Sequence, residues 1–154
     1  MVTIGILCKK AHIFTNGAIQ QFYFIYRVLE NCGYTVELLT GDNDFTQLEF
    51  VDIPVKKIAL STDFSYLDII IFGSAAITPC PESEFNEKVL KKLQDQNVKI
   101  VKIQCGNFFV LHQEEFVFNQ HKIIERDINP YIDEFWVLPM YDFAVDYMKM
   151  LTNK

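Results

Sequence analysis

The chain is poor in the residues that mark several large classes of protein. Among its 154 residues, 14 Lys and Arg stand against 20 Asp and Glu, which gives a formal net charge of −6. Lysines adjoin one another only in the isolated pairs Lys9-Lys10, Lys56-Lys57 and Lys91-Lys92. Because binding to a phosphate backbone requires a basic face, we expect no nucleic-acid partner.

Cysteine is also sparse, and its spacing argues against both disulfides and metal ligation. The cysteines at positions 8, 32, 80 and 105 form no C-x-x-C pair. Cys8 and His12 have ligand-like spacing, but no second pair accompanies them, so we expect no metal site. There is no apolar stretch of about 18 residues, as a membrane span would need, and no signal peptide. These features predict a cytoplasmic chain with free thiols and no membrane span.

Aromatic residues, in contrast, are abundant. The chain holds 14 Phe and 7 Tyr, and half of all residues are hydrophobic. A single core of this size needs less ring surface than this. We therefore expect part of it to line a cleft, or to meet a second domain or a second copy of the chain.

Short apolar runs alternate with segments of helical periodicity. Leu67–Phe72 is almost purely apolar, which is typical of a central strand buried on both faces. Pro54 interrupts another expected strand, which should therefore be irregular or lie at an edge. The expected strands are Val2–Cys8, Tyr34–Thr40, Phe50–Leu60, Leu67–Phe72, Val98–Cys105 and Asp133–Leu138. The expected helices are Gly17–Asn31, one entered at Pro79–Glu84, a short one in Phe108–Phe118, and Tyr141–Leu151.

This order of elements predicts a single α/β domain over residues 1–154. The sheet should be doubly wound and mostly parallel, with helices on both faces, in a Rossmann-like arrangement. In the last helix, Phe143, Tyr147 and Met150 share one face.

Three glycines follow expected strands of this sheet. Gly17 opens the first helix, and Gly73 and Gly106 close two further strands. Carboxyl ends of parallel strands share one edge, where a ligand meets free backbone N–H groups and a helix dipole. The expected ligand-binding residues are Asn16, Gly17, Gln20, Gly73, Gly106 and Asn107. The alternative at each is ordinary turn or cap chemistry. The single glycine at the first turn is not a dinucleotide fingerprint, so no cofactor is expected.

Cys105 is a second candidate, because it ends a strand just before Gly106. A thiol over a helix N-terminus has a lowered pKa and can act as a nucleophile. This arrangement resembles cysteine hydrolases and deglycases with a flavodoxin-like fold, with His112 or His121 as a base. Those proteins carry an acidic residue after the first strand, where this chain has Lys9-Lys10. The alternative is a small buried cysteine at a strand end.

Three segments together resemble a glycosyltransferase-like family of the GT-B class. Phe14–Gln21 (F-T-N-G-A-I-Q-Q) resembles its S-N-G-x-N-Q-N turn, and Lys99–Val110 (K-I-V-K-I-Q-C-G-N-F-F-V) resembles K-V-V-x-x-x-x-G-N-x-Y-V. Ile132–Pro139 (I-D-E-F-W-V-L-P) resembles Y-D-E-V-W-x-L-P. The resemblance implies the N-terminal, acceptor-side half of a sugar transferase, with Asn16-Gly17 facing a nucleotide-sugar across a cleft. The donor-binding half would then be missing.

The leading expectation is therefore a glycosyltransferase-like domain, either a fragment or a remnant, with a nucleotide-sugar and a sugar acceptor as ligands. No catalytic residue can be assigned from the motifs. One alternative is a cysteine-dependent hydrolase or deglycase that uses Cys105. Another is a non-enzymatic interaction module with a surface rich in Phe and Tyr for self-association and no affinity for small molecules.

Overall fold

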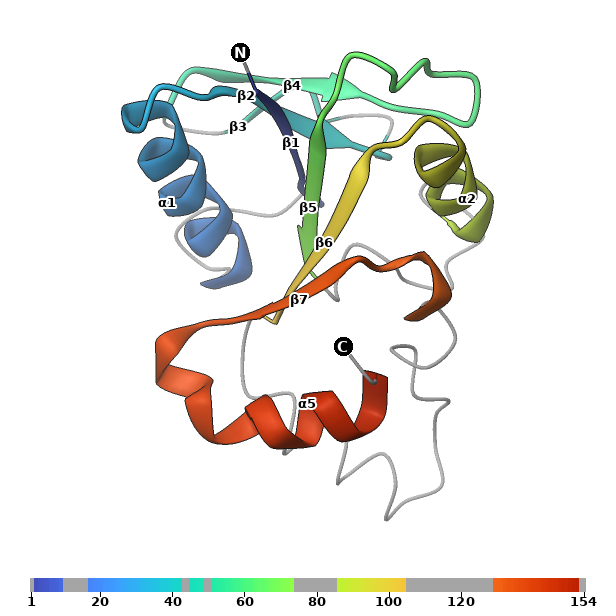
Figure 1. Cartoon of the computed structure of the whole chain (residues 1–154). Coiled ribbons are helices and arrows are strands. Elements are labelled where there is room, and N and C mark those ends of the chain that lie inside the picture. Colours follow the sequence, from blue (N-terminus) through green and yellow to red (C-terminus); the bar gives the residue numbers. More distant parts are fainter. Residues whose placement is uncertain are drawn as a thin grey trace.

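The computed structural model describes residues 2–9, 17–42, 45–48, 51–73, 86–104 and 129–152. These residues form a seven-stranded sheet with helices packed against it (Figure 1). The strands are β1 (Thr3–Leu7), β2 (Thr35–Thr40), β3 (Gln47–Leu48), β4 (Ile53–Lys57), β5 (Ile69–Gly73), β6 (Lys99–Gln104) and β7 (Glu134–Val137). The helices are α1 (Gly17–Asn31), α2 (Glu87–Asp95) and α5 (Val145–Thr152), with 3-10 helices η2 (Asn129–Tyr131) and η3 (Pro139–Ala144).

The strands lie in the order β3-β4-β2-β1-β5-β6-β7. Every neighbouring pair is parallel except β3 and β4, which are antiparallel. This confirms the expected α/β class with a mostly parallel sheet. In Figure 1, β1, β5 and β6 all end at the lower edge of the sheet, where α1 also begins. We call this edge the carboxyl edge.

The central strands alternate their side chains between two apolar clusters, one on each face. Ile4 and Ile6 of β1 belong to the cluster that contains Phe22 of α1. Leu7 belongs to the opposite cluster, which contains Leu93 of α2. The period of two in a strand explains this division. Each fully buried side chain of this kind contributes roughly 1.5–3 kcal/mol to folding.

α1 occupies the predicted residues, whereas α2 begins at a cap that was not foreseen. The side chain of Asn86 accepts a hydrogen bond from the backbone N–H of Lys88 at 3.0 Å. Val89 and Leu93 face the core, together with Leu90. The expected helix entry at Pro79–Glu84 and the expected helix in Phe108–Phe118 lie outside the described residues.

The sequence did not predict β3, whose two residues pair with Ile53 and Pro54 at the sheet edge. Pro54 thus lies within β4. Its neighbour on the outer side is β3, which has only two residues, so β4 is close to the edge of the sheet.

The last expected helix is observed as η3 followed by α5, and within η3 the backbone of Tyr141 is non-helical (φ −113, ψ 21). Its buried residues are Ala144 and Met148, while Phe143 and Met150 are exposed. Within the described segments, no helix combines the length and apolar character needed to cross a membrane.

Candidate functional site

The predicted ligand-binding residues that the structure describes lie at the carboxyl edge. Gly17 is the first residue of α1, and a Cβ atom there would meet nothing within 4 Å. Gln20 is half-buried in the same helix, and Gly73 is the buried last residue of β5. Asn16, Gly106 and Asn107 lie outside the described residues. The edge therefore presents a glycine and the start of a helix that has no acidic residue in its first turn.

Gln104, the last residue of β6, is the most unusual polar group at this edge. Its side chain is 2% exposed, and neither Oε1 nor Nε2 has a hydrogen-bond partner in the described part of the chain. Each buried polar atom left without a partner costs about 1–3 kcal/mol. Native structures keep few such atoms, and each calls for an explanation.

The sequence analysis overlooked Gln104, although a signal for it was present. In K-I-V-K-I-Q, all positions after the first are buried, yet two of them are polar. Lys102 and Gln104 alternate with Val101 and Ile103, so they share one face of the strand. Polar residues at core positions of a central strand are the pattern that would have identified them.

Lys102 lies directly behind Gln104 on this face and is 1% exposed. In the register of the sheet it stands between Phe72 of β5 and Phe135 of β7. Its Nζ lies 5.6 Å from the centre of the Phe135 ring, a distance at which a cation and an aromatic face attract each other. Gln104 is therefore backed by a row of two aromatic rings with a lysine between them.

The thiol that the structure describes at this edge is not activated. Cys8 is 3% exposed, and burial raises its pKa to about 12. A thiol with such a pKa is protonated at neutral pH and is a poor nucleophile. Cys105, together with all three histidines, lies outside the described residues. Among the described residues, no group of three His, Cys, Asp or Glu is placed to hold a metal ion.

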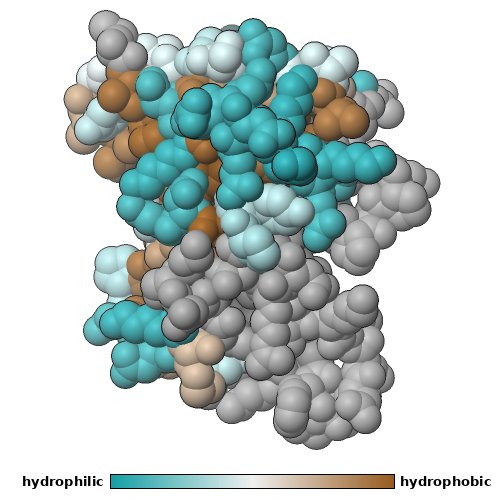
Figure 2. Space-filling view, turned by 45° about the vertical axis from the view of Figure 1, so that its right-hand side comes forward, coloured by the Kyte–Doolittle hydropathy of each residue, from teal (hydrophilic) through white to brown (hydrophobic). Residues whose placement is uncertain are grey.

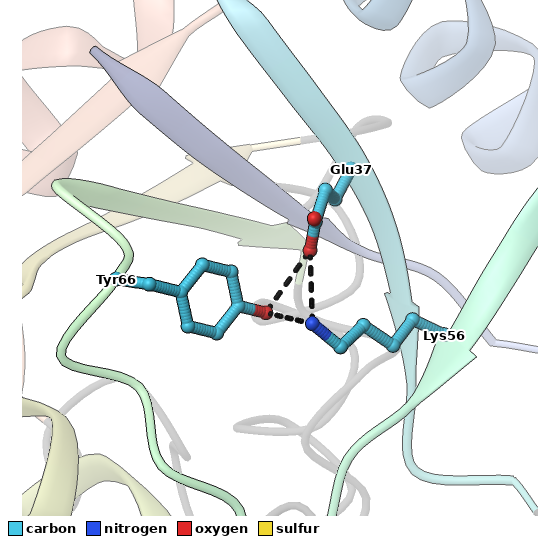
Figure 3. Close-up of polar contacts among 3 residues, drawn as sticks. All are labelled: Glu37, Lys56 and Tyr66. Carbon is cyan, nitrogen blue, oxygen red and sulfur yellow. Dashed lines mark hydrogen bonds and ion pairs between the residues drawn. The ribbon is translucent and has the colours of Figure 1, made fainter. Parts of the chain in front are cut away.

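A polar triad joins Glu37 of β2, Lys56 of β4 and Tyr66 of the turn before β5 (Figure 3). Lys56 Nζ donates to the Tyr66 hydroxyl at 2.9 Å, and that hydroxyl donates to Glu37 Oε2 at 3.0 Å. Lys56 Nζ also lies 3.5 Å from Glu37 Oε2. The hydrogen bond with Tyr66 raises the pKa of Lys56, and burial raises the pKa of Tyr66. Lysine and tyrosine therefore stay protonated at neutral pH, and the three side chains link β2 and β4 to the turn before β5.

A pocket of about 260 Å³ opens where β2 and β4 separate. The ladder between these strands ends at Leu38 and Val55, because the next residue, Pro54, has no N–H to donate. Tyr26 of α1 closes the pocket from the helix side. The lining is mainly apolar, and Glu37 and Lys56 are its charged residues.

The outer face of α1 is unusually apolar for a helix on a sheet. Phe24 is 62% exposed, and Val28, one turn later, is 60% exposed. Arg27 lies between them and is bound to Glu30 at 2.7 Å; these are the charged residues of α1. We call Phe24, Arg27 and Val28 the α1 outer face.

The side of the molecule that carries α2 is different. Figure 2 shows hydrophilic side chains gathered over the upper half of the molecule where that side comes forward. The exposed residues of α2 agree with this, since they are Glu87, Lys88, Lys91, Gln94 and Asp95. The two helices that cover the sheet thus have outer faces of opposite character.

Comparison with solved structures finds only distant likenesses. A protein assigned as a transcriptional regulator from Vibrio parahaemolyticus shares 16% identity with a TM-score of 0.44, over 99% of this chain and 91% of that one. An AraC family transcriptional regulator from Pseudomonas putida shares 11% identity with a TM-score of 0.41, over 89% and 75%. Homoserine dehydrogenase from S. aureus shares 10% identity with a TM-score of 0.37, over 88% and 32%. At these values the likeness carries no inference about function.

No curated protein matches the chain. One family profile, described as "Protein of unknown function (DUF2827)", matches residues 1–154. The profile that matches is that of DUF2827 and not that of a glycosyltransferase family, so the expected glycosyltransferase resemblance and the function drawn from it are wrong. Short motifs of common residue types, such as Asn-Gly before a helix, occur at strand ends for structural reasons alone. The chain belongs to the DUF2827 family.

Proposed function

We propose that this chain is a non-enzymatic interaction module that pairs with a second copy of itself through the α1 outer face. The observation that carries the proposal is the exposure of Phe24 and Val28 one turn apart on the same helix. An interaction module with an aromatic surface for self-association is an alternative that the sequence left open.

A helix that covers a sheet normally presents polar residues to solvent. α1 is apolar on more than one side, since Phe22 faces the core, Phe24 and Val28 face outward, and Tyr23 and Ile25 lie half-buried between. A helix with this pattern is typical of one covered on both sides. Clustered exposed apolar side chains mark interaction surfaces in soluble proteins.

The charge of α1 permits a second copy as the partner at this face. The chain carries a net charge of −6, so two copies repel each other over most of their surface. α1 is an exception, because the charges of Arg27 and Glu30 cancel within the helix. Around a two-fold axis, Phe24 of each copy can pack against Val28 of the other, as an isologous interface requires.

The expected association is weak. A helix of this length spans roughly 22 Å, and one face of it buries less than the 800 Å² or so per partner of a standard interface. We therefore expect association in the micromolar range or weaker, which increases with protein concentration.

Sedimentation velocity over a wide range of concentrations tests the proposal. The wild-type chain should move from monomer to dimer, and the double variant Phe24→Ser with Val28→Ser should stay monomeric. Both positions are exposed, so the variant should keep the melting temperature of the folded monomer.

Phe143→Ser provides a matched control, because Phe143 is 64% exposed but lies on η3. This variant should dimerise like the wild type. A wild-type chain that stays monomeric throughout, or a dimer that is lost in Phe143→Ser and kept in the α1 double variant, would contradict the proposal.

Four finer predictions remain alongside this proposal. The strand order on either side of β1 supports a Rossmann-like assignment of the sheet. The single-domain reading and the cytoplasmic location stay predictions from sequence. The ligand-binding role of Gly17, Gln20 and Gly73 also stays a prediction, and the nucleotide-sugar expected there rested on the resemblance that is now set aside.

A further inference from the structure

We propose that Gln104 forms a binding site at the carboxyl edge for a small planar molecule with an amide-like edge, meaning a carbonyl beside an N–H. The proposal rests on Gln104 and its neighbours in the sheet and is independent of self-association through α1. It concerns a residue that belongs to neither the predicted ligand-binding set nor the α1 outer face.

The chemistry follows from the two unpaired atoms of the side chain. Nε2 of Gln104 can donate hydrogen bonds and Oε1 can accept them, and both are buried without a partner in the described part of the chain. A carboxylate offers only acceptors and would leave Oε1 unpaired. An ammonium group offers only donors and would leave Nε2 unpaired. An amide-like edge pairs with both atoms through one rigid group.

A single rigid group also has an advantage over water. A single water that bridges both atoms must bend its two hydrogen bonds, and every ordered water loses entropy when it is fixed. One ligand edge makes the same two hydrogen bonds and fixes one molecule.

The position in the sheet favours a planar ligand. Gln104 ends a parallel strand, at the edge where open α/β sheets bind ligands. The row behind it holds Phe72, Lys102 and Phe135. Sites for small molecules are typically lined by apolar and aromatic side chains, with a few polar groups that fix orientation. In the proposed site Gln104 fixes the orientation of the ligand, and the two rings form the apolar row behind Gln104.

Another glutamine shows how this fold uses the same side chain structurally. Gln96 accepts a hydrogen bond from the Phe64 backbone N–H at 2.9 Å and donates one to Asp63 at 2.9 Å. Its amide oxygen and nitrogen are both paired within the chain, although it is less buried than Gln104. Gln96 is therefore satisfied by protein groups. Gln21 Oε1 is also buried without a partner, but only in Gln104 are both amide atoms unpaired among the described residues.

NMR titration of the 154-residue chain tests the site, with the side-chain NH₂ signals of Gln104 as the readout. The probes are uracil, which carries a lactam edge, and nicotinamide, which carries a primary amide. Benzoate is the control, because it is planar but offers only acceptors. At least one amide probe should shift the Gln104 signals, and benzoate should not. A shift with uracil alone assigns a lactam edge, and a shift with nicotinamide alone assigns a primary amide.

Two variants separate binding from folding. Gln104→Leu should weaken binding of the active probe about tenfold or more, as the loss of a paired polar group predicts, and should keep or raise the melting temperature. Gln96→Leu should lower the melting temperature and leave binding unchanged. The proposal is overturned if neither amide probe binds, if Gln104→Leu binds as well as the wild type, or if Gln104→Leu is destabilised as much as Gln96→Leu. The last result would show that ordered water gives Gln104 a structural role.

Discussion

At the scale of single residues, backbone conformation decides what several positions tolerate. α1 and α2 each end at a residue in the left-handed region, Gly33 (φ 88) after α1 and Asn97 (φ 58) after α2. In each case the next residue donates its backbone N–H back into the last turn, Tyr34 to Leu29 at 3.2 Å and Val98 to Leu93 at 3.0 Å. This is how a helix commonly ends, with a residue that accepts positive φ.

Two glycines with equally open surroundings should therefore respond differently to alanine. A Cβ atom at Gly33 or at Gly17 would meet nothing within 4 Å, but only Gly33 has a positive φ. Gly33→Ala should lower the free energy of unfolding by about 1–2 kcal/mol, because left-handed backbone strains an L-residue. Gly17→Ala should be neutral or stabilise by up to about 1 kcal/mol. Urea unfolding measures both, and equal effects would contradict this account.

At the scale of elements, the edge strand β7 is secured at its start by charged side chains. Asp133 accepts a hydrogen bond from the Ile100 backbone N–H at 2.7 Å. Glu134 pairs with Lys99 of β6 and accepts a hydrogen bond from the Trp136 indole N–H at 2.9 Å. Hydrogen bonds from Lys99 and then Trp136 hold the pKa of Glu134 below its ordinary value of 4.5. The strand is only four residues long, so such contacts matter to its docking.

This lowered pKa predicts a pH dependence of stability. The contribution of Glu134 is complete above pH 4.5, the ordinary pKa, and is lost as the pH falls through the lower pKa of the folded state. Glu134→Gln should therefore be less stable than the wild type at neutral pH, by less than about 1 kcal/mol because the pair is exposed. The difference should shrink in acid. Chemical unfolding at neutral and acidic pH measures it, and a difference that grows in acid would show that the sign is wrong.

At the scale of the whole molecule, the central strands serve two cores at once. β1 supplies Ile4 and Ile6 to one face and Leu7 to the other, so disruption of either cluster disturbs the strand they share. Gly5 of β1 is part of the same close packing, because a Cβ atom there would lie 2.5 Å from Leu39 Cδ1. We therefore expect the described core to open as a unit.

Thiol labelling measures this opening. Cys8 is sealed in the core with a pKa of about 12, whereas Cys32 is exposed at the end of α1. At mildly alkaline pH, an alkylating reagent should modify Cys32 in the native chain. Cys8 should react only as fast as the core unfolds, and its labelling should follow the global unfolding transition in denaturant. Peptide mass spectrometry identifies each site, and rapid native labelling of Cys8 would refute a single cooperative core.

The sequence alone determined those elements whose signal is local. α1 runs over the residues that its apolar spacing predicted, because periodicity reports which side of an element faces the core. The continuous apolar run Leu67–Phe72 predicted the buried strand β5. The placement of Gly17 and Gly73 at the ends of their elements followed from the same patterns. Sequence motifs misled where they were short, as in the glycosyltransferase resemblance.

Only the tertiary structure decided features that depend on neighbours distant in the chain. β3 forms only through its pairing with β4. Tyr66 contacts Glu37 and Lys56, which lie in two different strands. No sequence window shows that Phe24 stays uncovered or that both amide atoms of Gln104 are buried without a partner. The reason is physical: periodicity is a property of one segment, whereas burial and hydrogen-bond satisfaction are properties of everything packed around it.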